Sequence, residues 1–310
     1  MRTAKVLVLL ASYNGDEFLE EQLNSILNQN SVATDIIIFD DGSKDSTISV
    51  IERVISKFPN RITLLHNDEP IHNPLHSFSF LTEYVKEKKM VMNYDFISFS
   101  DQDDIWLPNK IKNSVDLILE TDAKVSISSG ISTNLVNKAN ITTYDKRVYT
   151  FGEALLKNNA IGMTMVFASD FFESIIFPEN INLKIWLHDH VMYLIALYQG
   201  VKIVFVREAG VIYRQHSRNV IGDTKANLIT QLKSKIKYVN NSQSDRKKIA
   251  NFLRNNYIGT HENQKLLDDY IEYEKKSIFV RLSIVHPRKI FAEKHNVYIV
   301  TKLLAILKKL

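Results

Sequence analysis

The chain of 310 residues contains no cysteine. This absence excludes a disulfide framework, a cysteine-ligated zinc site, an iron–sulfur cluster and a cysteine nucleophile. Proline and glycine are scarce, with 6 and 9 residues, and the sequence has no repeats or low-complexity tracts. With 45% hydrophobic and 24% charged residues, the composition is that of a globular protein and not of a disordered or fibrous chain.

Long hydrophobic runs are also missing. The first apolar run, residues 6–10, is too short for the core of a signal peptide. No window approaches the roughly 20 apolar residues that span a membrane. We therefore expect a cytoplasmic location. At roughly 100 to 200 residues per domain, the length allows one large or two modest domains.

The formal net charge of +4 hides an asymmetry along the chain. Residues 231–310 carry 17 Lys and Arg against 7 Asp and Glu, whereas residues 1–230 carry 22 against 28. Charge alone leaves a nucleic-acid binder open. However, clustered aspartates in the acidic first part suit a metal site, and the basic tail suits an anionic surface. We expect no nucleic acid among the partners.

Apolar segments of two kinds alternate in the first third of the chain. Short continuous runs predict buried strands at residues 6–10, 36–39, 61–65 and 96–99. Apolar residues at helical spacing predict helices at residues 18–27, 46–58 and 78–88. Strands that alternate with helices are typical of an α/β fold, in which helices flank a mainly parallel sheet.

The rest of the chain has a mixed pattern. We expect helices at residues 111–120 and 191–198 and strands at residues 125–128, 163–168, 201–206 and 210–213. From about residue 225 the chain is rich in Lys, Asn and Leu at helical spacing. We therefore predict one domain over residues 1–224 and a C-terminal helical appendix over residues 225–310.

Polar residues follow three of the predicted strands, at residues 12–14, 40–41 and 101–104. In open α/β sheets, ligands bind beyond the carboxyl ends of the strands. Asp101 and Asp103 would lie on one side of an extended segment, because side chains alternate with period two. They would suit one hard divalent cation whose coordination is completed by phosphate oxygens. Taken alone, Asp101 and Asp103 could instead belong to a solvated acidic turn.

The segment Asp40–Ser43 also has two interpretations. Asp and Gly favour turns, and Ser43 or Asp45 would cap the helix that follows. Alternatively, one carboxylate accepts a hydrogen bond from the imide N–H of uracil or thymine, and Tyr13 packs near the base. On the residues alone, the turn is the favoured interpretation.

Three motifs together resemble family 2 glycosyltransferases of the GT-A (Rossmann-like) fold: ASYNG at residues 11–15, DDGS at residues 40–43 and SDQDDIWLPNKI at residues 100–111. The DQDDIW form and YRQHSRNV at residues 213–220 look most like bacterial rhamnosyltransferases that build O-antigen or capsular glycans from dTDP-rhamnose. The resemblance covers residues 4–222.

The resemblance implies a site for a nucleotide-diphosphate sugar, either a dTDP- or a UDP-sugar. Ser12 and Tyr13 would line the base and the ribose. Asp41, with Asp40 beside it, would read the pyrimidine, and Asp101 would contact the nucleotide.

A metal site is implied as well. Asp103 would be the principal ligand of Mg²⁺ or Mn²⁺, with Asp101 and His216 also near the ion. Residues 67–78 depart from the family, which carries a glycine-bearing loop there, whereas this chain has NPLH at residues 73–76.

Asp189 falls where inverting members of the family keep their general base. There the carboxylate takes the proton from the acceptor hydroxyl as that hydroxyl attacks the anomeric carbon opposite the leaving diphosphate. Asp189 lies at the start of the predicted helix at residues 191–198, where the helix dipole and amide groups favour the ionised form.

Further residues are expected at the acceptor or the diphosphate, namely Gly162, Met163, Trp106, His188 and Arg214. Gly162 and Met163 resemble a family segment that faces the acceptor, although a strand start with glycine at a bend explains them equally well. A zinc site formed by His188, His190 and His216 is an alternative that the two-residue spacing around Asp189 does not support.

These observations predict an inverting, metal-dependent glycosyltransferase that moves rhamnose from dTDP-rhamnose to a hydroxyl of a lipid-linked cell-surface glycan. One alternative is a UDP-sugar-dependent galactosyl- or N-acetylglucosaminyltransferase, and another is a catalytically inactive partner subunit. An aspartyl phosphatase is disfavoured, because its Asp-x-Asp motif should follow the first strand.

The end of the chain, residues 297–310, combines apolar residues with lysines. This composition suits a helix lying on the anionic inner face of the plasma membrane, near a lipid-linked acceptor. A helix packed on the catalytic domain or on a second subunit of a homodimer is an equal alternative.

Overall fold

The structure is a computed structural model that describes residues 3–134, 140–142, 147–177, 183, 187–215, 243–273 and 277–279. The chain divides into two compact units, which are described separately. The first comprises residues 1–148, 160–179 and 202–222, and the second comprises residues 149–159, 180–201 and 223–310. The expected domain boundary after residue 224 stays a prediction.

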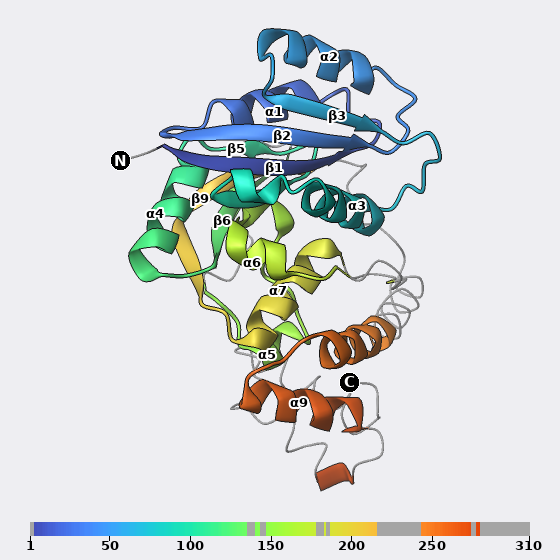
Figure 1. Cartoon of the computed structure of the whole chain (residues 1–310), viewed down its shortest axis with the longest axis vertical. Coiled ribbons are helices and arrows are strands. Elements are labelled where there is room, and N and C mark those ends of the chain that lie inside the picture. Colours follow the sequence, from blue (N-terminus) through green and yellow to red (C-terminus); the bar gives the residue numbers. More distant parts are fainter. Residues whose placement is uncertain are drawn as a thin grey trace. The chain divides into compact units, whose positions relative to one another are not determined.

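The first unit is built on one sheet (Figure 1). Its strands are β1 (Ala4–Ser12), β2 (Val32–Asp40), β3 (Ile62–His66), β4 (Phe96–Ser100), β5 (Ile105–Trp106), β6 (Val125–Asn134), β7 (Asn140–Thr142), β8 (Met165–Ala168) and β9 (Ile203–Gln215). Their order is β3-β2-β1-β4-β8-β6-β9-β5, and β7 pairs with β6.

The four strands predicted first, β1 to β4, pair in parallel. The sheet continues through antiparallel β8 into β6 and β9, which are parallel to each other. The expected α/β class with a mainly parallel sheet is thus confirmed. A parallel sheet needs cover on both faces, and this explains why the central strands are apolar throughout instead of alternating.

Helices of the first unit cover the sheet on both faces. They are α1 (Leu19–Leu27), α2 (Thr47–Lys57), α3 (Pro74–Glu87), α4 (Lys110–Thr121) and α6 (Ser169–Ser174), with short 3₁₀ turns η1 (Val91–Asn93) and η2 (Gly162–Thr164). Val6, Val8 and Leu10 of β1 pack in one core with α1, α2 and α4. On the other face, Phe99 of β4 contacts Phe78 of α3 and Phe172 of α6.

Several strands differ from the sequence expectation, since β6 continues to Asn134 and β7 was not expected. The strands expected at residues 201–206 and 210–213 form one continuous strand, β9, because β6 pairs along its whole length. Irregular register near Ser129 absorbs the polar residues between the two apolar runs. The strand β5 was not expected, since two residues beside a run of aspartates carry no periodic signal.

The second unit contains α5 (Phe151–Ala154), α7 (His188–Gln199), α9 (His261–Ile271) and a helix at residues 243–256. The expected helix at 191–198 is confirmed as α7, which begins earlier, at His188. Thr150 caps α5 in a capping box with Glu153, and Thr260 caps α9. Residues 280–310, which include the predicted membrane-facing end, lie outside the described residues.

The described helices include none that is long and apolar enough to cross a membrane.

Lys110, the first residue of α4, is buried in the first unit. Its Nζ lies 3.5 Å from the ring centroid of Trp106 and 3.1 Å from Ser98 Oγ. Ser98 donates its own hydroxyl proton to the carbonyl of Met165, so the lysine is the donor to Ser98. Burial lowers the pKa of Lys110 well below 10.5, because an ammonium ion loses its hydration inside the protein.

This burial predicts a pH-dependent stability. The unfolded chain holds the Lys110 proton up to about pH 10.4, whereas the folded chain releases it at lower pH, so the free energy of unfolding should rise with pH between the two pKa values, by up to about 1.4 kcal/mol per unit. Lys110→Met should remove this slope and change stability at pH 8 by less than about 1.5 kcal/mol.

Urea unfolding at pH 7, 8 and 9 measures both effects. Lys112→Met, a change of a partly exposed lysine in the same helix, is the control and should keep the slope. Equal slopes for wild type and Lys110→Met would show that Lys110 titrates normally.

Candidate functional site

Three loops meet at the carboxyl ends of β1, β2 and β4. Parallel register pairs Ser12 with Asp40 and Leu10 with Ser100, so the strands end side by side. Side chains then join the loops, because Gln102 accepts a hydrogen bond from the backbone N–H of Tyr13 at 2.8 Å and donates one to its carbonyl at 3.0 Å. The predicted convergence of these loops is present in the structure.

Asp40 is fully buried at the end of β2. One of its oxygens, Oδ1, accepts hydrogen bonds from the hydroxyls of Ser12, at 3.0 Å, and Ser43. The other, Oδ2, accepts from the Ser43 N–H at 2.9 Å and lies 3.1 Å from His66 Nδ1. Asp40 and Ser12 therefore hold the loops in place, and their contact with a nucleotide stays a prediction.

Asp41 is buried beside it but faces a different loop. Its Oδ1 accepts hydrogen bonds from Asn67 Nδ2 at 2.8 Å and from the Ile71 N–H at 3.1 Å. Its Oδ2 accepts from the His72 N–H at 2.5 Å. The carboxylate expected to read a pyrimidine is thus bonded to residues that follow β3. Its role in base recognition stays a prediction.

The aspartates after β4 differ in burial. Asp101 and Asp103 are half-buried, whereas Asp104 is completely buried. The chain bends at Gln102 and Asp103, and only the residue directly before β5, Asp104, is buried. The strand β5 follows at once, and its pairing with β9 fixes the end of the loop, with Trp106 opposite Val211.

Asp104 is a residue that the sequence interpretation missed. Neither of its carboxylate oxygens has a hydrogen-bond partner among the described residues. Burial raises the pKa of Asp104 well above its usual range, and the charges of Asp101 and Asp103 raise it further. Alternation along the segment would not have identified it, because Gln102 would share its side and is half-buried.

The residue types fit a divalent cation at this loop. Carboxylate oxygens are the ligands that Mg²⁺ and Mn²⁺ prefer, and the half-buried Asp101 and Asp103 lie close enough to Asp104 for their charges to raise its pKa, so three carboxyl groups gather in this loop. Within the described ranges, no three His, Asp or Glu side chains gather as a complete cage. Asp101 and Asp103 would therefore supply part of the ligand set, and His216 lies outside the described residues.

Arg214 of β9 reaches the same loop. Its Nη1 donates a hydrogen bond to the Asp103 carbonyl at 3.3 Å, its Nη2 pairs with Glu21 of α1, and its guanidinium lies 5.1 Å from the ring centroid of Phe18. Only 6% of the Arg214 side chain is exposed. In this arrangement Arg214 holds the backbone of the aspartate loop. Its expected contact with the acceptor or diphosphate stays a prediction.

The other residues expected at the acceptor in the first unit are buried. Trp106 and Met163 belong to the hydrophobic core between the sheet and its helices, and Gly162 opens the 3₁₀ turn before β8. This packing explains why apolar residues occupy positions 106 and 163, and it does not support direct contact with an acceptor. The acceptor roles of all three stay predictions.

The expected base, Asp189, lies in the first turn of α7 in the second unit. It is buried, and its Oδ1 accepts a hydrogen bond from the His190 N–H at 2.6 Å. Burial lowers the pKa of His188 to about 3 and that of His190 to about 4, so both histidines are neutral at neutral pH. His190 Nε2 lies 2.6 Å from the Ala154 carbonyl and is therefore the protonated nitrogen.

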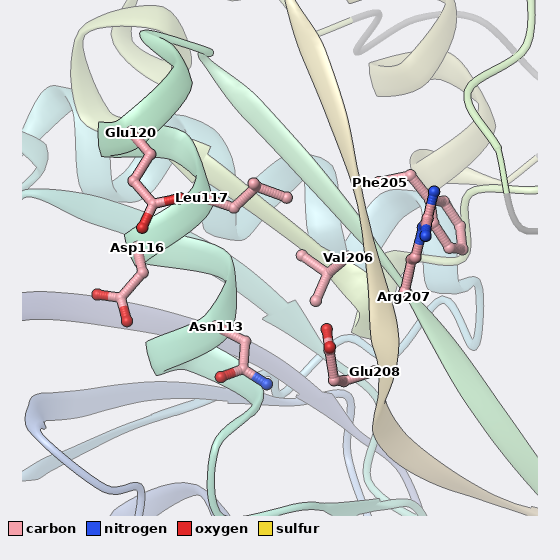
Figure 2. Close-up of a pocket in the computed structure, with 8 residues that line it drawn as sticks. All are labelled: Asn113, Asp116, Leu117, Glu120, Phe205, Val206, Arg207 and Glu208. Carbon is pink, nitrogen blue, oxygen red and sulfur yellow. The ribbon is translucent and has the colours of Figure 1, made fainter.

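A hollow of about 430 Å³ lies elsewhere in the first unit, between α4 and β9. It is lined by Asn113, Asp116, Leu117, Glu120, Phe205, Val206, Arg207 and Glu208. Figure 2 shows Val206 and Glu208 directed toward α4, while Phe205 and Arg207 point to the other side of the strand. None of the predicted site residues lines it.

Comparisons with known proteins identify the fold and the closer relatives. A relative from Shigella flexneri named dTDP-rhamnosyl transferase RfbG is 34% identical over 224 residues, which cover 69% of this chain and 73% of the relative. The Escherichia coli protein WfgD, a UDP-Glc:α-D-GlcNAc-diphosphoundecaprenol β-1,3-glucosyltransferase, is 26% identical over 56% of this chain and 64% of its own length.

Solved structures show the same fold at low identity. Residues 1–349 of Staphylococcus aureus TarS in complex with UDP-GlcNAc match with a TM-score of 0.62 at 14% identity, over 98% of this chain and 90% of that structure. The mannosyltransferase PcManGT of Pyrobaculum calidifontis, in complex with GDP-Man and Mn²⁺, matches with a TM-score of 0.57 at 12% identity, over 99% and 75%. The expected GT-A fold is thereby confirmed.

The family itself is shown by the sequence. Residues 7–176 match the family described as glycosyl transferase family 2, and this range contains the loops after β1, β2 and β4 that the structure brings together. The chain belongs to glycosyl transferase family 2.

Proposed function

We propose that this glycosyltransferase is an inverting, metal-dependent enzyme that moves rhamnose from dTDP-rhamnose to a hydroxyl of a lipid-linked glycan. The observation that supports the proposal is the meeting of the loops after β1, β2 and β4, in which Gln102, the residue between Asp101 and Asp103, is hydrogen-bonded to the backbone of Tyr13. The 34% identity to a dTDP-rhamnosyl transferase supports the choice of donor.

The residues of the first unit would bind and orient the donor. Tyr13 is 37% exposed, so its ring offers an apolar face for a base. Asp101 and Asp103 would hold Mg²⁺ or Mn²⁺, and a bound cation offsets the negative charge that develops on the leaving diphosphate. Gln102 and Arg214 keep this loop in register with β1 and β9.

Asp189 would remove the proton from the acceptor hydroxyl. As the acceptor oxygen bonds to the anomeric carbon, the bond from that carbon to the diphosphate oxygen breaks and Asp189 takes the hydroxyl proton. Attack from the face opposite the leaving group inverts the configuration. The first turn of α7 favours the ionised carboxylate that this step needs.

A lipid-linked acceptor fits the WfgD relative, whose name specifies a diphosphoundecaprenol acceptor. Contact with an anionic membrane and a homodimer stay predictions, because the basic segment that would provide either lies outside the described residues.

Substitutions of Asp103 and Asp189 should impair different steps of the reaction. Asp103→Asn should weaken Mn²⁺-dependent dTDP binding by at least ~10-fold, since even indirect disturbance of a metal site costs that much. Asp189→Asn should bind dTDP normally and lower turnover by ~10² to 10⁴, which is the usual contribution of a general base. Calorimetry with dTDP and Mn²⁺, together with a product assay, measures both effects.

Asp122→Asn is the matched control, because Asp122 is an exposed carboxylate in a left-handed conformation that asparagine also adopts. A loss of dTDP affinity in Asp189→Asn would contradict the proposed role of Asp189.

The donor is tested by a panel of nucleotide sugars. We expect hydrolysis and transfer with dTDP-rhamnose and at least tenfold slower reaction with UDP-glucose, UDP-galactose, UDP-GlcNAc and GDP-mannose. A preference for a UDP-sugar would overturn the rhamnose assignment and favour the UDP-sugar alternative. Inactivity with every donor, despite binding of nucleotide, would favour a catalytically inactive partner subunit.

A further inference from the structure

The segment 67–73, between β3 and α3, is held by a single carboxylate. Asp41 accepts hydrogen bonds from the Asn67 side chain and from the backbone N–H groups of Ile71 and His72. The Asn67 N–H also donates to the Asp40 carbonyl at 2.9 Å, which continues the pairing of β3 with β2. We call residues 67–73 the Asp41-bound loop.

The neighbouring turn is shaped to receive this loop. Gly42 has φ of +74°, and a Cβ added at this position would lie 2.9 Å from Cβ of Pro70. Any larger residue would be strained and would push the Asp41-bound loop away. The glycine after Asp41 therefore serves the close approach of this loop.

The Asp41-bound loop places an aromatic ring on Tyr13. His72 adopts φ of +53°, an uncommon conformation outside glycine, and its ring centroid lies 4.0 Å from that of Tyr13 at an interplanar angle of 38°. Rings at this distance are in contact, so a base has no room between them. One face of Tyr13 is thus covered by His72, while the residue as a whole is still 37% exposed.

Tyr13 is restrained from two directions. Gln102 binds its backbone N–H and its carbonyl, so the loop after β4 fixes the main chain, while His72 fixes the ring. An aromatic ring held in one orientation loses little entropy when a second planar group stacks on it, and this preorganisation strengthens binding.

Asp41 has little capacity left for a ligand. Its Oδ1 already accepts two hydrogen bonds and its Oδ2 accepts one, so three of about four acceptor positions are used within the protein. All three donors belong to the Asp41-bound loop. The main effect of the carboxylate in this structure is therefore on the loop.

We propose that Asp41 anchors the loop that presses His72 against Tyr13, and that His72 is a positioning residue which fixes the Tyr13 ring as the stacking surface for the base of the donor. This inference rests on the proposed function, because it needs a nucleotide at Tyr13. It assigns to His72 a part in donor affinity and to Asp41 an indirect part.

The first experiment removes the ring of His72 in the full chain. His72→Asn keeps a residue that tolerates positive φ, and His72→Phe restores an aromatic ring. With dTDP and Mn²⁺, we expect the Kd of His72→Asn to rise about 2- to 10-fold, the usual worth of an aromatic pair, and His72→Phe to recover most of the loss. With dTDP-rhamnose, KM should rise while kcat at saturating donor changes less than twofold.

Binding of inorganic pyrophosphate with Mn²⁺ separates the base from the phosphates. Pyrophosphate has no base, so its affinity should be equal in wild type and His72→Asn. His261→Ala, a change of an exposed histidine in the second unit, is the control and should leave all values unchanged.

The second experiment tests the anchor. Asp41→Asn replaces an acceptor oxygen by an N–H₂ group that cannot accept from the loop, so the loop should detach and the Kd for dTDP should rise as in His72→Asn. The double variant should be no weaker than either single variant, because both act on one contact.

The outcomes distinguish a failure of the proposed function from a failure of the inference about His72 and Asp41. If wild type binds neither dTDP nor UDP with Mn²⁺, the proposed function fails. If wild type binds but His72→Asn and the control bind equally well, the inference about His72 is wrong and the proposed function stands. If His72→Asn does not fold, the result for Asp41→Asn decides. A loss far larger than 10-fold in Asp41→Asn, with pyrophosphate binding intact, would show that Asp41 reads the base itself and would overturn the inference.

Discussion

The parallel pairing of β1 with β2 on one side and β4 on the other is the constraint on which the site depends. Parallel strands run in the same direction, so the residues that follow each strand leave the sheet at the same edge. Ser12, Asp40 and Ser100 therefore end up side by side although they are far apart in sequence. Helices must cover both faces of such a sheet, which leaves its edge as the place where polar loops gather.

The buried carboxylates at this edge of the sheet differ in their hydrogen bonding. Asp40 and Asp41 accept hydrogen bonds from hydroxyl and amide groups of the protein. These hydrogen bonds hold the loops in one defined arrangement. Asp104 has no such partners among the described residues and lies beside two further carboxylates. Aspartate thus accepts hydrogen bonds that stabilise one loop, whereas in the next loop burial and neighbouring carboxylates favour its neutral, protonated form.

Much of the first unit could be predicted from the sequence. Apolar runs at residues 6–10, 36–39, 61–65 and 96–99 became the four parallel strands, because a strand buried on both faces must be apolar throughout. The full length of β9 could not be predicted, since its middle is polar and only the ladder with β6 extends it. The strand β5 exists for the same reason, through pairing and not through its own composition.

The candidate site shows a similar division between sequence and structure. The motifs identified the loops and their residue types, because the three motifs together are specific. They did not show the bonds from Asp41 to the segment after β3 or the contact of His72 with Tyr13. Those contacts join residues about 30 to 60 positions apart, and no local pattern encodes them.

By itself, then, the sequence determined the α/β class, the family and the loops that carry the chemistry, since these follow from local periodicity and from motif residues. Only the tertiary structure decided which buried aspartate is bonded and which is not, and which side of Tyr13 is covered. The physical reason is that burial and hydrogen-bond satisfaction depend on what the rest of the chain brings into contact with a side chain, not on its neighbours in sequence.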